Sequence, residues 1–226
     1  MDNINKLIIQ EARPLPVIIL ADTSGSMFAN NNIGTLNSAI REMIDSLKGE
    51  DSLRAEIYFS IISFGGNMVT EYLPFSKVNE ISLNEDLKAG GGTPMGEAFR
   101  VTKELIEDKN IISSRSYAPT IILLSDGIPT DDWKNPLNSF LSSPRASKSF
   151  RIAMSIGAGE EGKKVLTEFL GDSNLPLFEA NQARDIKKFF KFVTMSVSQR
   201  VQSVNPNQVI DTSIDDMDDD LDDFEF

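Results

Sequence analysis

The chain of 226 residues contains no cysteine and no histidine. It therefore cannot form disulfides, thiolate metal sites, a thiol nucleophile or a Ser-His-Asp triad. Any metal that it binds must be a hard cation held by oxygen ligands. The sequence also lacks a long apolar run and a basic leader followed by an apolar core. We therefore expect no membrane span and no signal peptide, and a cytoplasmic location.

The charge is acidic and unevenly distributed. The chain has 22 basic and 34 acidic side chains, a formal charge of −12, which argues against a nucleic-acid-binding surface. Nine of the acidic residues lie in residues 211–226, where there is no basic residue, so residues 1–210 carry only −3. Because such a dense run of like charges repels itself, residues 203–226 are predicted to be a disordered acidic tail.

Apolar side chains interrupt the acidic run, and an acidic–apolar mixture can dock in a basic, apolar pocket of a partner. The tail ends in DDFEF, which resembles the acidic tips of bacterial single-stranded-DNA-binding proteins, and those tips occupy basic grooves. We predict that Phe224 and Phe226 contact a partner. The tail could bind a basic protein surface or the chain's own metal site, or it could simply be solvated. The apolar residues are Ile214, Met217, Leu221, Phe224 and Phe226.

Short β-branched apolar runs alternate with segments of helical periodicity. This alternation predicts an α/β fold with a doubly wound, mostly parallel sheet and helices on both faces. Pro74 favours an edge position for one strand, which we expect to pair antiparallel with the strand before it. The domain is predicted to span residues 14–202, after an N-terminal extension at 1–13. Strands are expected at 16–21, 56–64, 68–75, 120–125, 150–156 and 177–178, and helices at 34–48, 94–107, 133–141, 161–170 and 183–199.

Three polar segments flank these elements. Asp22, Ser24 and Ser26 alternate directly after the first strand, Thr93 lies in the glycine-rich segment 90–96, and Asp126 follows the strand at 120–125. Because sheets of this kind place their sites at the carboxyl ends of the strands, these oxygens could meet around a hard cation. Alternatively, Asp22 and the serines could cap the next helix or brace loops.

These residues resemble the three parts of a metal-ion-dependent adhesion site in a von Willebrand factor A (vWA, Rossmann-like) domain. The segment DTSGS at 22–26, Thr93 and Asp126 occur in the family's order, and the resemblance covers roughly residues 14–200. The flanking segments RPLPVIILADTSGSM and GGGTPMGEA resemble small bacterial members that are encoded with tellurium-resistance and stress genes. Those members often lie beside a protein kinase and a metal-dependent phosphatase.

The resemblance implies a role for each residue. Ser24, Ser26 and Thr93 would hold Mg²⁺, or alternatively Mn²⁺ or Ca²⁺, and Asp22 and Asp126 would orient ligands or waters or bind directly. One free position would accept an Asp or Glu carboxylate of a protein partner. The implied function is a non-enzymatic, Mg²⁺-dependent adaptor in a bacterial stress or signalling complex, with a Ser/Thr kinase and a metal-dependent phosphatase as candidate partners.

A second motif supports a competing hypothesis. The segment from Gly157 to Lys164 follows a strand and matches G-x-x-x-x-G-K, but Lys164 stands where a phosphate-binding loop has Ser or Thr, and Glu160 and Glu161 would face phosphate. The alternative function is thus a nucleotide hydrolase, or a metal-assisted hydrolase at the oxygen site. The plainer interpretation of this segment is a glycine loop between a strand and a helix.

Two aromatic residues near the oxygen site are candidates for partner contacts. Trp133 is the only tryptophan and follows Asp126 closely, and Phe28 follows Ser26. Exposed aromatic side chains beside a binding site are typical of hot spots. Both residues could instead pack into the core.

Overall fold

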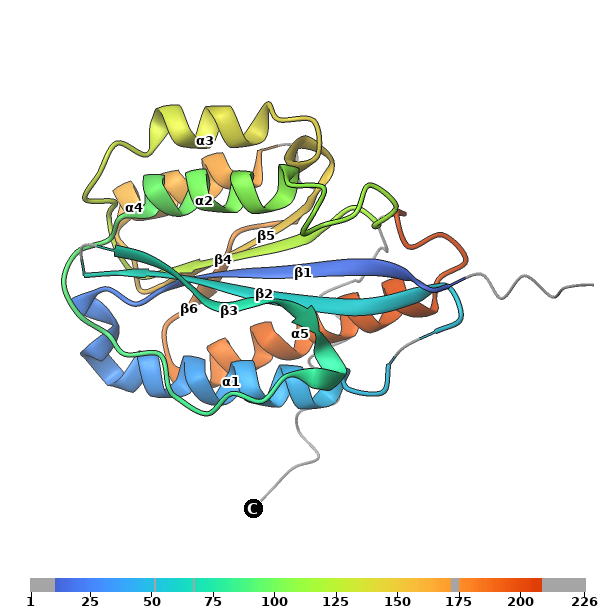
Figure 1. The fold of residues 1–226 in the computed structure, drawn as a ribbon. Coiled ribbons are helices and arrows are strands. Elements are labelled where there is room, and N and C mark those ends of the chain that lie inside the picture. The colour runs from blue at the N-terminus through green and yellow to red at the C-terminus, as the bar shows by residue number, and fades with distance from the viewer. Residues whose placement is uncertain (1–10, 51, 67, 172–174, 209–226) are drawn as a thin grey trace, which may run out of the picture.

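The computed structural model describes residues 11–50, 52–66, 68–171 and 175–208. Within these residues the predicted alternation of strands and helices is present, and the α/β fold class is confirmed (Figure 1). The elements are β1 (Arg13–Asp22), η1 (Gly25–Asn31), α1 (Asn32–Leu47), β2 (Ala55–Gly65), β3 (Met68–Lys77), η2 (Val78–Glu80), α2 (Met95–Glu107), β4 (Thr120–Ser125), α3 (Lys134–Leu141), η3 (Ala146–Lys148), β5 (Phe150–Ile156), α4 (Glu160–Leu170), β6 (Phe178–Ala180) and α5 (Ala183–Gln202).

The sheet has the order β3-β2-β1-β4-β5-β6. Among the described strands only β2 and β3 pair antiparallel, so β3 is the predicted antiparallel edge strand. The chain leaves β1 toward β2 on one side and later returns to place β4 on the other, with Ala21 opposite Leu124. The strand order therefore reverses between β1 and β4, and a ligand site is expected at their carboxyl ends.

Two apolar clusters hold the helices on opposite faces of the sheet. Alternate side chains of β1 point to opposite faces, so Val17 and Ile19 join the cluster that includes α1 and α5. Ile18 and Leu20 join the cluster that includes α2, α3 and α4. Figure 1 shows these two helical layers below and above the sheet. The burial of β1 on both faces explains why its sequence is a continuous apolar run.

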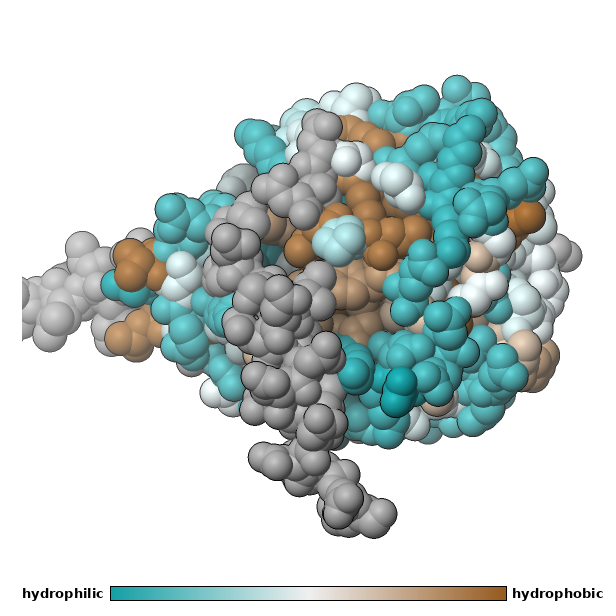
Figure 2. All heavy atoms as spheres, turned by 180° about the vertical axis from the view of Figure 1, so that it is seen from behind, coloured by the Kyte–Doolittle hydropathy of each residue, from teal (hydrophilic) through white to brown (hydrophobic). Residues whose placement is uncertain are grey.

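The side of the molecule seen from behind has a partly apolar surface. Figure 2 shows a hydrophobic area with hydrophilic residues above and below it. The edge strand β6 pairs with Met154–Ile156 of β5. Its first residue, Phe178, and the preceding Leu177 are half-buried. Among the helices of the described residues, none combines the length and apolarity needed to cross a bilayer.

A buried arginine fixes the carboxyl end of α5 to the start of β4. The Arg200 guanidinium donates to the carbonyl oxygens of Pro206 and Ala118 at 2.9 and 2.7 Å and to the Thr120 hydroxyl, and it lies 4.0 Å from the centre of the Phe150 ring. Burial lowers the pKa of Arg200 to about 9, so the group stays charged at neutral pH. Contacts with the domain thus continue beyond the predicted boundary at residue 202. Residues 209–226 of the predicted tail lie outside the described residues.

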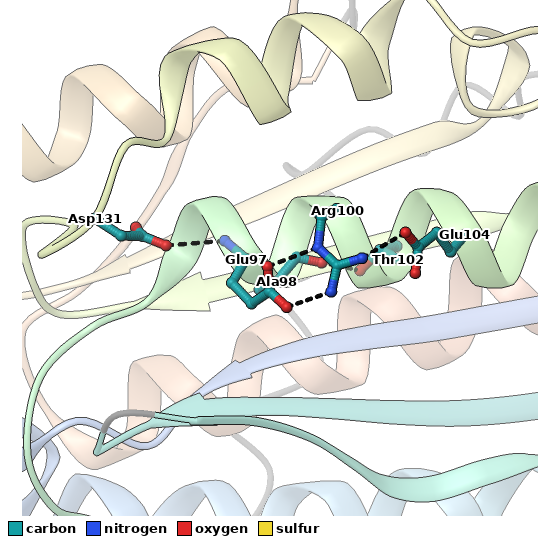
Figure 3. Close-up of polar contacts among 6 residues, drawn as sticks. All are labelled: Glu97, Ala98, Arg100, Thr102, Glu104 and Asp131. Atoms are coloured by element: carbon teal, nitrogen blue, oxygen red, sulfur yellow. Dashed lines mark hydrogen bonds and ion pairs between the residues drawn. The ribbon is translucent and has the colours of Figure 1, made fainter.

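The amino end of α2 is capped by a side chain from a distant loop. Pro94 precedes the helix and offers no side-chain hydrogen bond. Instead, the Asp131 carboxylate accepts the backbone N–H groups of Gly96 and Glu97, both at 2.9 Å. Figure 3 shows the contact with Glu97. A carboxylate there satisfies free N–H donors and interacts favourably with the helix dipole. Asp131 therefore joins the loop after β4 to the start of α2.

We predict that Asp131→Ala lowers the free energy of unfolding by about 1–2 kcal/mol, because a charged cap is lost. Urea unfolding in EDTA would measure this. The matched control is Asp45→Ala, which removes only an exposed ion pair with Lys48 and should change stability by less than about 0.5 kcal/mol. Equal effects of the two substitutions would contradict the capping role.

Candidate metal centre

Backbone contacts hold together three segments near the carboxyl ends of β1 and β2. The Gly90 N–H donates to the Thr23 carbonyl oxygen at 2.8 Å, and the Gly25 N–H donates to the Gly91 carbonyl oxygen at 2.9 Å. Gly91 has φ +64°, and a Cβ atom there would lie 2.3 Å from the Cα of Gly66. Only glycine fits this backbone approach without strain. The DTSGS loop, the β2–β3 hairpin and the segment 90–96 are thereby held together.

Asp22 is the buried centre of the arrangement, with no exposed surface. Its carboxylate accepts the Ser24 N–H at 2.7 Å and the hydroxyl of Ser125 at the end of β4. Burial raises the pKa of Asp22 from its ordinary value of 3.8 to about 6, with a smaller upward contribution from Asp126, while the hydrogen bonds from Ser125 and Ser24 oppose the shift. The carboxylate is thus costly to ionise unless a cation compensates it.

Three further oxygens form a small triangle beside Asp22. Ser24 Oγ and Ser26 Oγ are 3.0 Å apart, and Asp126 Oδ1 lies 3.3 Å from the first and 2.7 Å from the second. Burial raises the pKa of Asp126, and the hydrogen bonds from the two serines partly offset this. Both serine hydroxyls donate to the Asp126 carboxylate.

Thr93 reaches the same place from the other loop. A Cβ atom built on Gly127 would lie 3.2 Å from Thr93 Oγ1, 3.8 Å from Ser26 Oγ and 4.0 Å from Asp22 Oδ2. These oxygens therefore surround one small space that glycine leaves open. The structure brings together all five residues that the sequence singled out, namely Asp22, Ser24, Ser26, Thr93 and Asp126.

The arrangement fits a small hard cation. An octahedral Mg²⁺ has ligands at about 2.1 Å, so neighbouring ligand atoms lie about 3.0 Å apart. The triangle of Ser24, Ser26 and Asp126, with edges of 2.7–3.3 Å, has the size of one face of that octahedron. In the described residues no three acidic side chains gather as a metal site. A cation here would be held largely by hydroxyl groups.

The sequence did not single out three residues that position this site. Ser125 binds Asp22, Asp131 caps α2, and Thr130 exchanges hydrogen bonds with the backbone of Thr93 through its own hydroxyl and N–H at 3.0 and 2.9 Å. Each acts across a long sequence separation, so no local spacing could reveal it. The only available signal was their place within five residues of Asp126, at the end of a buried strand.

The predicted partner-contact residues differ in their surroundings. Phe28 is 66% exposed and lies two residues from Ser26. Trp133 is half-buried and packs against the cluster of α2, α3 and α4. Ile128, which the sequence did not single out, is 51% exposed and lies two residues from Asp126. Phe224 and Phe226 lie outside the described residues.

The glycine loop after β5 is short. Only three residues separate Ile156 from the start of α4 at Glu160. Gly162 is therefore inside the helix, where a Cβ atom would lie 2.9 Å from the Gly127 carbonyl oxygen. Lys163 Nζ pairs with the Glu179 carboxylate at 2.8 Å. This segment packs beside the Asp126 loop and does not form a long loop around an empty space.

A family model described as von Willebrand factor type A domain matches residues 17–128. Among curated proteins, the chain is 26% identical over 212 residues to inter-alpha-trypsin inhibitor heavy chain H4 of Bos taurus. The match covers 88% of this chain and 22% of that protein, so the chain spans about a fifth of the length of this relative.

Solved structures share the fold at low sequence identity. The pilus adhesin SpaC of Lactobacillus rhamnosus GG matches with a TM-score of 0.68 and 14% identity over 85% of this chain and 31% of that chain. Proximal thread matrix protein 1 from the mussel byssus, in a form with a zinc-occupied metal-ion-dependent adhesion site, matches with a TM-score of 0.59 and 16% identity over 82% of this chain and 48% of that chain. The sequence match over residues 17–128 and the shared fold together support a von Willebrand factor type A domain in this chain.

Proposed function

We propose that the chain is a non-enzymatic binding module that captures a carboxylate of a protein partner through Mg²⁺. Ser24, Ser26 and Thr93 would hold the ion by their hydroxyl groups, and Asp22 and Asp126 would bind it or orient its waters. The single observation that carries the proposal is the convergence of these five side chains on the space beside Gly127. The zinc-occupied site in the mussel protein supports a divalent metal at this place in the fold.

The donor set explains why an acidic ligand would be preferred. Hydroxyl groups are neutral donors, so they leave most of the cation's charge available to an incoming carboxylate. When bound, the ion would supply this electrophilic position, while the chain fixes where it lies. Phe28 and Ile128 add exposed apolar surface within two residues of the donors. We therefore propose that the preferred partner carries an apolar side chain close to its Asp or Glu.

The glycine loop gives less support to the hydrolase alternative. A phosphate-binding loop needs free backbone N–H groups and an available lysine. Here Gly162 lies within α4 and Lys163 pairs with Glu179. Nucleotide turnover by the purified chain that disappears with Lys163→Ala would overturn the binding proposal. The kinase, phosphatase and stress-gene context stays a prediction from sequence resemblance.

We expect Thr93→Val to weaken Mg²⁺ binding at least about tenfold, which corresponds to about 1.4 kcal/mol. The substitution keeps the shape of the side chain but removes one hydroxyl donor. Calorimetric titration of the metal-free chain with Mg²⁺ measures the affinity. Thr167→Val removes an exposed hydroxyl on α4 that donates to Lys163, and this control should bind Mg²⁺ like the unmodified chain. Equal affinities of both variants would contradict the proposed site.

Partner capture should follow the metal. Immobilised chain should retain its protein partner with Mg²⁺ present and release it in EDTA, because the ion provides the contact to the carboxylate. Thr93→Val should lose the partner and Thr167→Val should keep it. Replacing the bound Asp or Glu of the identified partner by its amide should abolish capture. Retention of the partner in EDTA would contradict the metal-dependent mechanism.

The raised pKa of Asp22 predicts a pH dependence of stability. A carboxyl group with a higher pKa in the folded chain binds its proton more tightly there than in the unfolded chain. Its contribution to the free energy of unfolding therefore falls as pH rises from about 4 to about 7. Metal-free Asp22→Asn should therefore gain stability relative to the unmodified chain over this range, reaching about 2–3 kcal/mol at neutral pH, since one pKa unit is 1.36 kcal/mol.

Urea unfolding in EDTA at several pH values tests this. The Asp22→Asn variant should also lose the stabilisation that Mg²⁺ gives to the unmodified chain. A difference between the two proteins that does not change with pH would show that burial of the ionised carboxylate is not the cause.

A further inference from the structure

A second candidate binding surface lies between α1 and α5. These helices lie side by side below the sheet (Figure 1), and a groove of about 620 Å³ runs between them. Its buried apolar residues are Ala39 and Met43 of α1 and Phe190 of α5, and Met195, 39% exposed, adds to the lining. An apolar groove between helices suits an extended or helical segment with apolar anchors.

The lining of the groove is basic, in contrast to the rest of the chain. Four basic residues of α5 line it, at positions 184, 187, 188 and 191. This i, i+3, i+4, i+7 spacing places them on one face of the helix. Glu42 is the only acidic residue of the lining, and its ion pair with Lys187 is long, at 3.7 Å. The groove thus combines net positive charge with apolar contact area in a protein of charge −12.

The acidic C-terminal segment has the complementary composition. Residues 211–226 carry nine acidic and five apolar side chains. The last described residues are tied to the carboxyl end of α5 through the contact of Arg200 with Pro206. From there the 18 residues of 209–226 can span up to about 60 Å, whereas α5 with 20 residues is about 30 Å long. The segment can therefore reach every part of the groove of its own chain.

We propose that the groove between α1 and α5 binds residues 211–226 of the same chain. The segment would run back along α5, with its carboxylates against the basic stripe and its apolar side chains over Met43 and Phe190. This binding needs no metal, because the groove supplies the positive charge itself. It is weakened by salt, which screens exposed charges. This proposal does not depend on metal binding, so each of the two can be tested separately.

Methionine methyl groups provide the test in the full-length chain. Of the eight methionines, Met43 and Met195 line the groove and Met217 lies in the acidic segment. With carbon-13 methyl labelling, the Met217 signal should be displaced from its random-coil position at low salt. It should move toward that position as salt is raised. Lys187→Glu combined with Lys191→Glu should abolish the displacement and change the Met43 and Met195 signals.

The control carries the same charge change elsewhere. Lys109→Glu combined with Lys148→Glu alters two exposed lysines outside α1 and α5 and should leave the Met217 signal displaced. All four lysines are exposed, so we expect both double variants to fold. Thermal unfolding of both variants checks this. The displacement should be the same at tenfold lower protein concentration and in EDTA.

Four results would overturn the proposal. A random-coil Met217 signal in the unmodified chain would show that the segment does not bind. An equal loss in the control variant would show a nonspecific charge effect. Dependence on protein concentration would place the segment on a second copy. Loss of the displacement in EDTA would place it at the metal centre.

Discussion

The arrangement of the site follows from the burial of one carboxylate at the end of a central strand. Asp22 has no exposed surface, so its oxygens need partners from the protein. The pairing of β1 with β4 brings Ser125 to one oxygen, and the turn after β1 brings the Ser24 N–H to the other. These two contacts set the direction in which the DTSGS loop leaves the sheet. The serine hydroxyls then meet Asp126, which follows Ser125 directly.

The sequence predicted the elements, and it singled out five oxygen-bearing residues that lie together in the structure, because both leave local patterns. A buried strand is a continuous apolar run, a helix repeats its apolar residues, and a polar loop after a strand marks the carboxyl edge. The contacts that position the donors leave no such pattern. Ser125, Thr130 and Asp131 act on residues that are distant in sequence, and only folding shows which groups they reach. The α1–α5 groove was unpredictable for the same reason, since each helix alone is an ordinary amphipathic helix.

The two ends of the sheet are stabilised by different chemistry. At the carboxyl end, carboxylates and hydroxyl groups converge, and burial makes their negative charge costly without a cation. At the opposite end, the buried Arg200 satisfies carbonyl groups of the loops around Ala118 and Pro206. This second cluster fixes where the acidic segment leaves the domain. The position of one arginine therefore determines which surfaces that segment can reach.

The contact between Gly91 and Gly66 is made by backbone atoms, so the three loops hold their positions without help from neighbouring side chains. Phe28 and Ile128, near the serines and Asp126, are largely exposed and contribute little to the core. Substitutions at such exposed positions can therefore accumulate without disturbing the five oxygen-bearing side chains of the site. The surface around the five oxygen-bearing residues can therefore vary while their arrangement stays constant, and the two can be engineered separately.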